Sequence, residues 1–445
     1  MSYPSWPRRA FETPYCPLLT LVYGTGKEAG VATSHERVAN LRQHPAGQPT
    51  SLWRNRDYLL FWSGQSLSDI GGAISELAYP LLVLSISHSP AAAGLVAALR
   101  ALPGALFGLF GGVLVDRWDR RKVMLTCDAL RALCLLSIPL AYALGHLSIA
   151  QLAVAAFVEG TLLTVFRLAK TATVPELITP SQLQTAVAQE EFVEGTTTLV
   201  GPALSGFLYT LGAILPFLTD GLSYLISLTT LALMRTPFQR TRTTKPHHMG
   251  AEIRAGLRWV WQQPFILTMT LMMGAGAFGL SGQALVIIIL AERARATAVV
   301  IGLIVAVGGI GSILGSLLTT RLGRLLTVGQ SILLSRWFFA LSWALYALAP
   351  FPPILAAVEF GMGFMDPIED IPYFSHRLKL IPEELRGRVI SVCRLLPATL
   401  RPLGLALTGI LIQRLGIFPT IWLTWVWLLA ATVLVTVVPT VRRER

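Results

Sequence analysis

Ionisable side chains lie inside segments of this chain that are otherwise apolar. In the segment 58–86, one helix face holds Gln65, Asp69, Gly72 and Glu76, because their spacing returns them to within about 40° at about 100° per residue. An ionisable group at the centre of a bilayer costs roughly 2.5–3.5 kcal/mol on insertion scales, so this stripe must face protein or a water-filled cavity. A carboxylate in such a cavity can bind and release a proton as the cavity opens to each side.

Other charged residues occupy similar positions in later apolar segments. They are Arg100, Glu159, Asp366, Arg394 and Arg401. We expect Asp69 or Glu76 to pair with Arg100. The acids of the segment 353–376 are expected to pair with Arg394 or Arg401.

These residues together form the predicted pathway for protons and substrate. Within it, the expected proton carriers are, in order, Asp69, Glu76 and Glu159. The alternative interpretation is that the charges form fixed ion pairs, which only specify how the helices pack.

The composition of the chain excludes an ordinary soluble protein. Its 445 residues are 53% hydrophobic and 13% charged, with a mean hydropathy of +0.60, whereas soluble proteins are about 25% charged. Spanning a bilayer takes about 20 apolar residues per helix. Twelve such segments are predicted: 58–86, 91–115, 122–145, 148–170, 183–210, 213–234, 264–291, 297–319, 327–349, 353–376, 386–413 and 416–439. The sequence therefore predicts an all-α polytopic membrane protein.

Positive charge lies beside the apolar segments and falls mostly on one side of the membrane. With the N-terminus inside, the outer loops hold only Arg293, Arg295 and Arg414. Cytoplasmic loops are enriched in Lys and Arg, so both termini are expected in the cytoplasm. The net charge of +12 then serves membrane topology, and no nucleic-acid partner is expected.

Four regions follow from these patterns. Residues 1–50 are polar and rich in proline, and we expect a cytoplasmic, largely disordered tail. Two six-helix bundles are predicted at 51–234 and 264–445. The basic link 235–263 contains an amphipathic stretch that suits the surface of the inner leaflet.

A glycine-rich helix end runs into a cluster of charges between the second and third segments. The cluster consists of Gly112, Asp116, Arg117, Arg120 and Arg121. Glycine lets helix backbones approach closely in lipid, and the cluster of cations fixes this end of the helix on the cytoplasmic side. The stretch from Gly111 recurs at Gly315, which indicates two related halves. Thr320 stands where the first copy has Asp116, so charge-based gating is expected of the first copy.

The fifth segment contains a proline flanked by small residues, at Gly201, Pro202 and Gly206. Proline removes a backbone hydrogen bond and small residues permit close packing, which favours a bend suited to gating. The pattern resembles the fifth-helix motif G-P-x-x-G-G of a class of exporters, with Ser205 in place of one glycine.

Together these motifs resemble the major facilitator superfamily. The charged loop matches its pattern G-x-x-x-D-R-x-x-R-R. The local sequences around Asn55, Asp220 and Leu385 resemble those of the bacterial drug:proton antiporter branch, which is related to macrolide and siderophore exporters. The resemblance implies alternating access around a site near the bilayer midplane. It also implies a bacterial inner or plasma membrane, protons and an amphipathic or hydrophobic small molecule as the partners, and a monomer.

Two other functions stay open at this point. One is an uptake symporter or lipid transporter of the same fold, and the other is a non-transporting scaffold or sensor, which would leave the buried acids without a purpose. The chain has no Walker loop, no Gly-x-Ser-x-Gly and no His-Glu-x-x-His, so neither an enzyme nor a cofactor is expected. No metal site is expected, because the cysteines lack a C-x-x-C pair.

Overall fold

The computed structural model describes residues 52–108, 118–236, 249–323 and 325–442. All of these belong to one compact unit of the chain. The predicted tail 1–50 lies outside the described residues, as do Gly112, Asp116 and Arg117 of the predicted gating loop.

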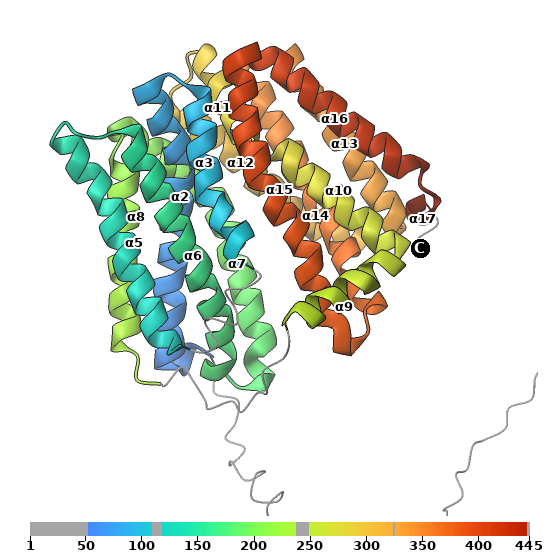
Figure 1. Cartoon of the computed structure of the whole chain (residues 1–445), viewed down its shortest axis with the longest axis horizontal. Coiled ribbons are helices and arrows are strands. Elements are labelled where there is room, and N and C mark those ends of the chain that lie inside the picture. The colour runs from blue at the N-terminus through green and yellow to red at the C-terminus, as the bar shows by residue number, and fades with distance from the viewer. Residues whose placement is uncertain (1–51, 109–117, 237–248, 324, 443–445) are drawn as a thin grey trace, which may run out of the picture. The chain divides into compact units, whose positions relative to one another are not determined.

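Helices make up almost all of the described chain (Figure 1). The first half, which we call the N-half, comprises η1 Leu52–Arg54, α2 Arg56–Ser87, α3 Pro90–Phe107, α5 Arg120–Ala143, α6 Ile149–Leu177, η2 Pro180–Gln182, α7 Leu183–Leu211 and α8 Leu215–Leu233. The second half, the C-half, comprises α10 Pro264–Leu280, α11 Gln283–Arg293, α12 Ala298–Leu322, α13 Val328–Leu348, α14 Pro352–Leu380, η3 Glu383–Leu385, α15 Arg386–Leu415, α16 Ile417–Val437 and α17 Pro439–Arg442. Between them lies α9, Met249–Gln262.

The predicted all-α membrane fold is confirmed. Nine spans in the described segments are long and apolar enough to cross a membrane, with α10 and α11 counted as the single span Pro264–Arg293. The other three predicted segments are occupied by α7, α8 and α14, which are helical but more polar. The predicted count of twelve therefore adds to these nine spans the three helices α7, α8 and α14, which are not among them.

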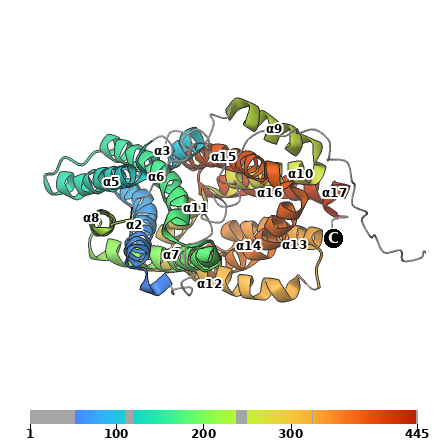
Figure 2. The ribbon, with the colours of Figure 1, turned by 90° about the horizontal axis from the view of Figure 1, so that it is seen from below.

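Two ends of the molecule can be distinguished from the order of the helices. One end, which we call the α9 end, holds α9, η2 and η3. The opposite end holds the short turns at 88–89, 144–148, 212–214 and 294–297. Figure 2 shows α9 at the edge of the C-half beside α10 and α15, against which it packs.

Local sequence explains why the helices begin where they do. The side chains of Asn55, Ser89, Asp119 and Ser148 each accept a hydrogen bond from a backbone N–H in the first turn of α2, α3, α5 and α6. Such N-caps satisfy donors that the first turn of a helix leaves free. The short capped connections place α3 beside α2 and α6 beside α5.

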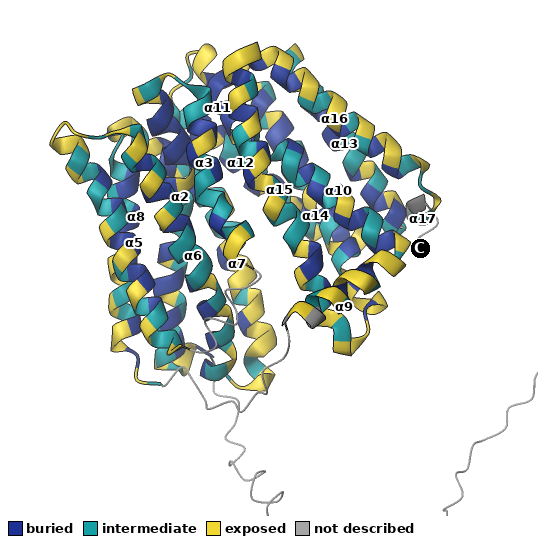
Figure 3. Ribbon diagram, in the orientation of Figure 1, coloured by how far each residue is buried: buried dark blue, intermediate teal, exposed yellow. Residues whose placement is uncertain are grey.

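Figure 3 marks exposed residues in yellow along most helices, and many of the exposed residues are large and apolar. Leu133 on α5 and Leu434 on α16 are each 67% exposed, and Val154 on α6 is 63% exposed. Soluble proteins rarely expose apolar patches of this kind. A surface of this composition is suited to contact with lipid chains.

Glycine contacts join the two halves at the opposite end. A Cβ on Gly94 of α3 would lie 2.7 Å from the carbonyl oxygen of Leu405 and 2.9 Å from the Cα of Gly409, both on α15. A Cβ on Gly206 of α7 would lie 2.2 Å from the carbonyl oxygen of Ala298 on α12. The backbones of the paired helices therefore meet almost directly, as small residues permit inside a membrane.

Replacing Gly206 by Ala should push α7 and α12 apart at the opposite end, because the added methyl group has no room beside Ala298. Overpacking of this kind costs about 1–3 kcal/mol, which shifts a two-state equilibrium by roughly 5–150-fold. Double electron–electron resonance between spin labels at positions 211 and 297 measures the fraction of molecules with these ends apart.

The matched control is Gly195→Ala, also on α7, where a Cβ meets nothing within 4 Å. It should leave the distance distribution as in the parent protein. A distribution that is also unchanged in Gly206→Ala would contradict the role of this contact in joining the halves.

Candidate functional site

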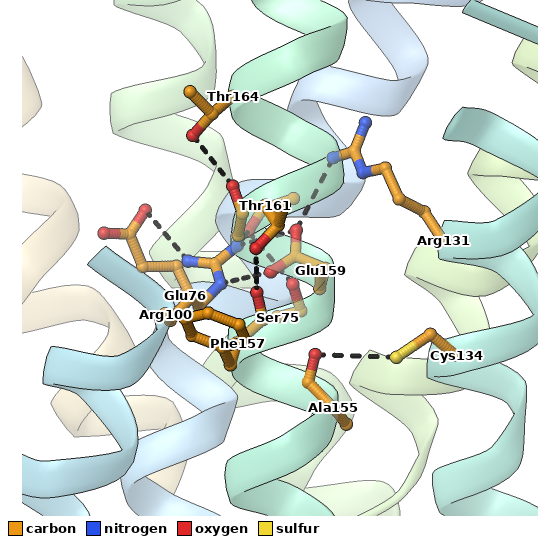
Figure 4. A network of polar contacts seen from close by, with 12 residues as sticks. Ser75, Glu76, Arg100, Arg131, Cys134, Ala155, Phe157, Glu159, Thr161 and Thr164 are labelled. Atoms are coloured by element: carbon orange, nitrogen blue, oxygen red, sulfur yellow. Dashed lines mark hydrogen bonds and ion pairs between the residues drawn. The ribbon is translucent and has the colours of Figure 1, made fainter. Parts of the chain in front are cut away.

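The best-defined polar site is a carboxylate held between two guanidinium groups inside the N-half. Glu159 on α6 is fully buried. Its Oε2 accepts a hydrogen bond of 2.6 Å from Nε of Arg100 on α3, and its Oε1 lies 3.5 Å from an Nη of Arg131 on α5. The hydroxyl of Tyr224 on α8 donates to the same Oε1 at 3.3 Å. Four helices therefore meet at one carboxylate. Figure 4 shows Glu159 with Arg100 and Arg131.

A second set of polar groups supports Arg131 from the other side. Its guanidinium lies 3.7 Å from Asp128, one turn earlier on α5, and 3.8 Å from the ring centroid of Tyr224. Asp128 in turn accepts a hydrogen bond of 2.6 Å from Ser227, which accepts one of 2.9 Å from Gln65 of the predicted stripe. The network gives nearly every buried charge a partner, as burial in low dielectric requires.

Glu76 links the two halves. Its Oε2 lies 3.8 Å from an Nη of Arg100, and its Oε1 accepts a hydrogen bond of 3.3 Å from Arg401 on α15. The side chains of Glu76 and Arg401 are 59% and 58% exposed, so this pair is accessible, unlike Glu159. The predicted pair of Glu76 with Arg100 is present, and Arg401 has a partner in the opposite half.

Asp69 has a different partner from the one that we predicted. Its Oδ2 lies 2.9 Å from Nζ of Lys170 on α6, and the same Nζ lies 2.6 Å from Oε1 of Glu190 on α7. Asp69 stands about two helical turns from Glu76, on the side of α2 that leads to the α9 end, which is why it meets Lys170 instead of Arg100. One ammonium group thus joins three helices of the N-half.

The predicted pairing of the α14 acids with Arg394 or Arg401 is wrong. Glu369 is instead bonded to Arg336 of α13, whose Nε donates to it at 2.8 Å. The reason is packing, because α13 lies against α14 whereas α15 packs against α3, α9, α10 and α16. Asp366 and Arg394 are both exposed, and neither forms a hydrogen bond or ion pair with the residues that the structure describes.

The two described arginines of the predicted gating loop bind helix ends within the N-half. Arg120 donates a hydrogen bond of 2.9 Å to the carbonyl of Ala172 on α6. Arg121 donates to the carbonyl of Ala232 at 2.8 Å, in the last turn of α8. Cations are favourable at the C-terminal carbonyls of helices, so both contacts tie the start of α5 to its neighbours.

The fifth-helix motif lies where α7 meets two other helices. A Cβ on Gly201 would lie 2.5 Å from the Cβ of Ala73 on α2. The carbonyl of Pro202 lies 2.3 Å from the position that a Cβ on Gly302 of α12 would take, and Gly206 packs against Ala298 as described above. The small residues of the motif therefore permit contacts both within the N-half and across to the C-half.

Sequence reasoning left Arg131, Lys170 and Tyr224 out of the predicted site. Arg131 and Lys170 were available as charges inside apolar segments, which is the signal that had identified Arg100 and Glu159. Tyr224 had no such signal, since its role depends on the approach of α8 to α6. Within the described segments, no group of three or more His, Cys, Asp or Glu side chains is arranged to hold a metal ion.

Comparison with known proteins agrees with the fold and the motifs. The family model described as "Transmembrane secretion effector" matches residues 48–444. The multidrug efflux pump Tap of Mycolicibacterium fortuitum is 26% identical over 362 residues, which cover 79% of this chain and 88% of Tap. Macrolide efflux protein A of Streptococcus pyogenes is 25% identical over 381 residues, which cover 82% of this chain and 91% of that protein.

Solved structures share the fold at low sequence identity. A bacterial homologue of the iron transporter ferroportin, in an inward-facing state, superposes with a TM-score of 0.70 at 16% identity, covering 88% of this chain and 100% of that one. A bacterial homologue of the lysosomal transporter Spinster, also inward-facing, gives 0.68 at 15% identity, covering 87% and 97%. With the family match across nearly all of its length, the chain belongs to the transmembrane secretion effector family of major facilitator superfamily transporters.

Proposed function

We propose that this transporter exports amphipathic or hydrophobic small molecules in exchange for protons, by alternating access. The observation that carries the proposal is the position of Glu76, an accessible carboxylate shared between Arg100 of its own half and Arg401 of the other half. Export is favoured over uptake because the relatives Tap and macrolide efflux protein A are named as efflux proteins. Membership of a transporter family argues against a passive scaffold.

Glu76 suits the role of the proton-coupling group. While it is ionised it attracts two guanidinium groups and ties α2 to α15. Protonation removes its charge, so both attractions are lost and the halves are free to reorient. A cargo molecule that displaces Arg401 also breaks the ion pair between Glu76 and Arg401. A proton and a cargo molecule therefore act on the same interaction between the halves, as exchange requires.

Glu159 suits a positioning role instead. It is fully buried and pairs with two guanidinium groups at once, so its neutralisation would leave them only the more distant carboxylates of Glu76 and Asp128. In the proposal it holds Arg100 in place for Glu76. Asp69 shares Lys170 with Glu190 and provides a second, less accessible acidic site on the pathway. Asp366 and Arg394, both exposed, are assigned to the substrate pathway.

The conformation is interpreted as inward-facing. The halves meet at the opposite end through glycine contacts, and the ferroportin and Spinster homologues are in inward-facing states. In this interpretation the α9 end and both termini face the cytoplasm of a bacterium, and the bundles 51–234 and 264–445 move about the link 235–263. The loop of Gly112, Asp116, Arg117, Arg120 and Arg121 would then gate the inner face.

An apolar groove supports a hydrophobic cargo. It has a volume of about 300 Å³ and lies between α7 and α12, one helix from each half. Its lining is aliphatic and includes Leu199, Val200, Ala203, Leu303 and Ala306. Small-molecule sites are mostly apolar with few polar groups, and the groove offers an apolar wall of this kind.

Glu76→Gln should abolish proton-driven export while leaving the fold intact. Exposed ion pairs contribute only about 0–1 kcal/mol to stability, but the neutral amide cannot release a proton. In proteoliposomes, export of ethidium and of a macrolide driven by a pH gradient should be lost. Cargo-induced proton release should fall by at least tenfold.

The control for this variant is Glu383→Gln, which removes an 86% exposed carboxylate paired with Arg386 at the α9 end. It should transport and release protons as the parent does. Full proton release by Glu76→Gln would remove Glu76 from the mechanism.

Glu159→Gln should destabilise the protein far more than Glu76→Gln. Breaking a buried ion pair by removing one partner costs about 3–5 kcal/mol, because the remaining charge is left unpaired. Thermal unfolding in the same detergent compares the two variants directly. Equal melting temperatures would show that the buried network does not hold the N-half together.

Orientation can be tested with single cysteines in a background in which the native cysteines are replaced. A cysteine at Ser181 in η2 should be shielded from a membrane-impermeant maleimide in intact cells and labelled after lysis. A cysteine at His146, in the turn between α5 and α6, should be labelled in intact cells. The reverse pattern would contradict the inward position of the α9 end.

A further inference from the structure

A buried carboxylate in the C-half has only neutral hydrogen-bond partners. Glu359 on α14 is 8% exposed. Its Oε1 accepts a hydrogen bond of 2.5 Å from Nε2 of Gln283 on α11 and another from the hydroxyl of Tyr346 on α13. Gln283 also donates to the Tyr346 hydroxyl at 3.2 Å. The three side chains form a closed polar cluster that the proton pathway described above does not use.

No cation compensates Glu359 among the residues that the structure describes. Glu159 has two arginines, Glu369 has Arg336 and Asp69 has Lys170, whereas the side-chain partners of Glu359 are an amide and a phenol. A buried carboxylate that stays ionised without a cation costs several kcal/mol. Uptake of a proton removes that cost.

The surrounding helices bring few charges toward this cluster. On α13 the ionisable groups are Tyr346, which donates to Glu359, and Arg336, which is engaged by Glu369. The only ionisable residue of α12 is Arg321, in its last turn at the α9 end. Those of α11 are Glu292 and Arg293, in its last turn at the opposite end. On α14 itself, Asp366 interacts electrostatically with Glu359 about two turns away and opposes its negative charge.

The two oxygens of Glu359 have different surroundings. Oε1 accepts both hydrogen bonds, and Oε2 accepts none from the described residues. Oε2 lies 3.5 Å from the position that a Cβ on Gly308 of α12 would occupy, so this glycine keeps the space beside the oxygen open. A proton can therefore add to Oε2 while the two donors stay on Oε1.

We propose that Glu359 is a second proton-binding site, located in the C-half and separate from Glu76. The reaction is the addition of one proton to the carboxylate at Oε2, which gives a neutral carboxylic acid. The proposal rests on proton-coupled export as the function, and it adds a site on the half that Glu76 does not occupy.

The position of Gln283 connects this site to the contact between the halves. Gln283 is the first residue of α11, directly after the break that separates α11 from α10. A Cβ on Gly282 in that break would lie 2.4 Å from the side chain of Thr408 on α15. One turn earlier on α15, a Cβ on Gly404 would lie 2.0 Å from the carbonyl oxygen of Phe278 at the end of α10.

Protonation of Glu359 should therefore affect α15. Hydrogen bonds to a charged acceptor are roughly twice as strong as those between neutral groups, so a neutral Glu359 holds Gln283 less firmly. The break then has more freedom against Thr408, and α15 carries both Arg401 and the Gly409 that meets Gly94 of α3. Protonation of Glu76 and protonation of Glu359 would therefore both affect α15.

Infrared difference spectroscopy tests proton binding at Glu359 without any cargo. The full chain in liposomes is measured at acid and alkaline pH in H₂O and in D₂O. The parent protein should show the C=O stretching band of a buried neutral carboxyl group that disappears at alkaline pH, and Glu359→Gln should lack that band. A difference spectrum of Glu359→Gln identical to that of the parent would overturn the proposal.

Two further variants keep this result interpretable. Glu369→Gln removes a buried carboxylate from the same helix that is bonded to Arg336, and it should retain the band. Glu359→Asp keeps a carboxyl group at the site, and its band should persist at a shifted frequency. Loss of the band in Glu369→Gln but not in Glu359→Gln would assign the proton to Glu369 and overturn the proposal.

Transport measurements then separate this inference from the proposed function. Glu359→Gln should exchange ethidium across the membrane in counterflow within about twofold of the parent, yet release fewer protons per ethidium exported. If the parent protein shows the titrating band but no cargo-induced proton release, proton-coupled export fails while proton binding at Glu359 stands. If the parent releases protons and Glu359→Gln releases as many, the second site fails while the proposed function stands.

Discussion

The cost of placing a charge in hydrocarbon governs the polar interior of this transporter. Most buried charges of the N-half have a partner on a different helix, so the charges also determine which helices touch. Glu159 draws Arg100 and Arg131 together from α3 and α5, and Lys170 joins α2, α6 and α7. Packing and electrostatics are therefore a single constraint here, because a helix that moved away would leave a charge unpaired in a medium that does not solvate it.

The two halves are both helical but differ in their chemistry. The central carboxylate of the N-half is held by arginines, whereas Glu359 in the C-half is held by an amide and a phenol. Between the halves lie two kinds of contact: glycine contacts at the opposite end and the accessible pair of Glu76 and Arg401. The first allows close approach without specific charge, and in the proposed function the second depends on protonation. Under that proposal, one end stays closed while a proton changes what holds the halves together.

Sequence patterns predicted the helical segments and the acidic stripe on α2, because these follow from hydropathy and helical periodicity. They left open whether Asp69 or Glu76 pairs with Arg100, and the structure has the pair with Glu76. They did not predict that Asp69 would pair with Lys170 or that Arg401 would reach Glu76 from the other half. Those contacts depend on how helices far apart in the chain are placed in space. The sequence also did not predict the neutral surroundings of Glu359, because no motif or spacing distinguishes Gln283 and Tyr346. Their contact depends on the break between α10 and α11.

The central claim is that an ionised Glu76 ties α2 to α15 in this conformation. The most direct test is double electron–electron resonance between one label on α2 and one on α15 at the α9 end, followed in liposomes as the pH is lowered. We expect that lowering the pH reduces the fraction of parent molecules with the α2–α15 distance of this conformation. Glu76→Gln should show this reduced fraction at every pH. Distances that do not change with pH in the parent protein, or a pH response that survives in Glu76→Gln, would contradict it.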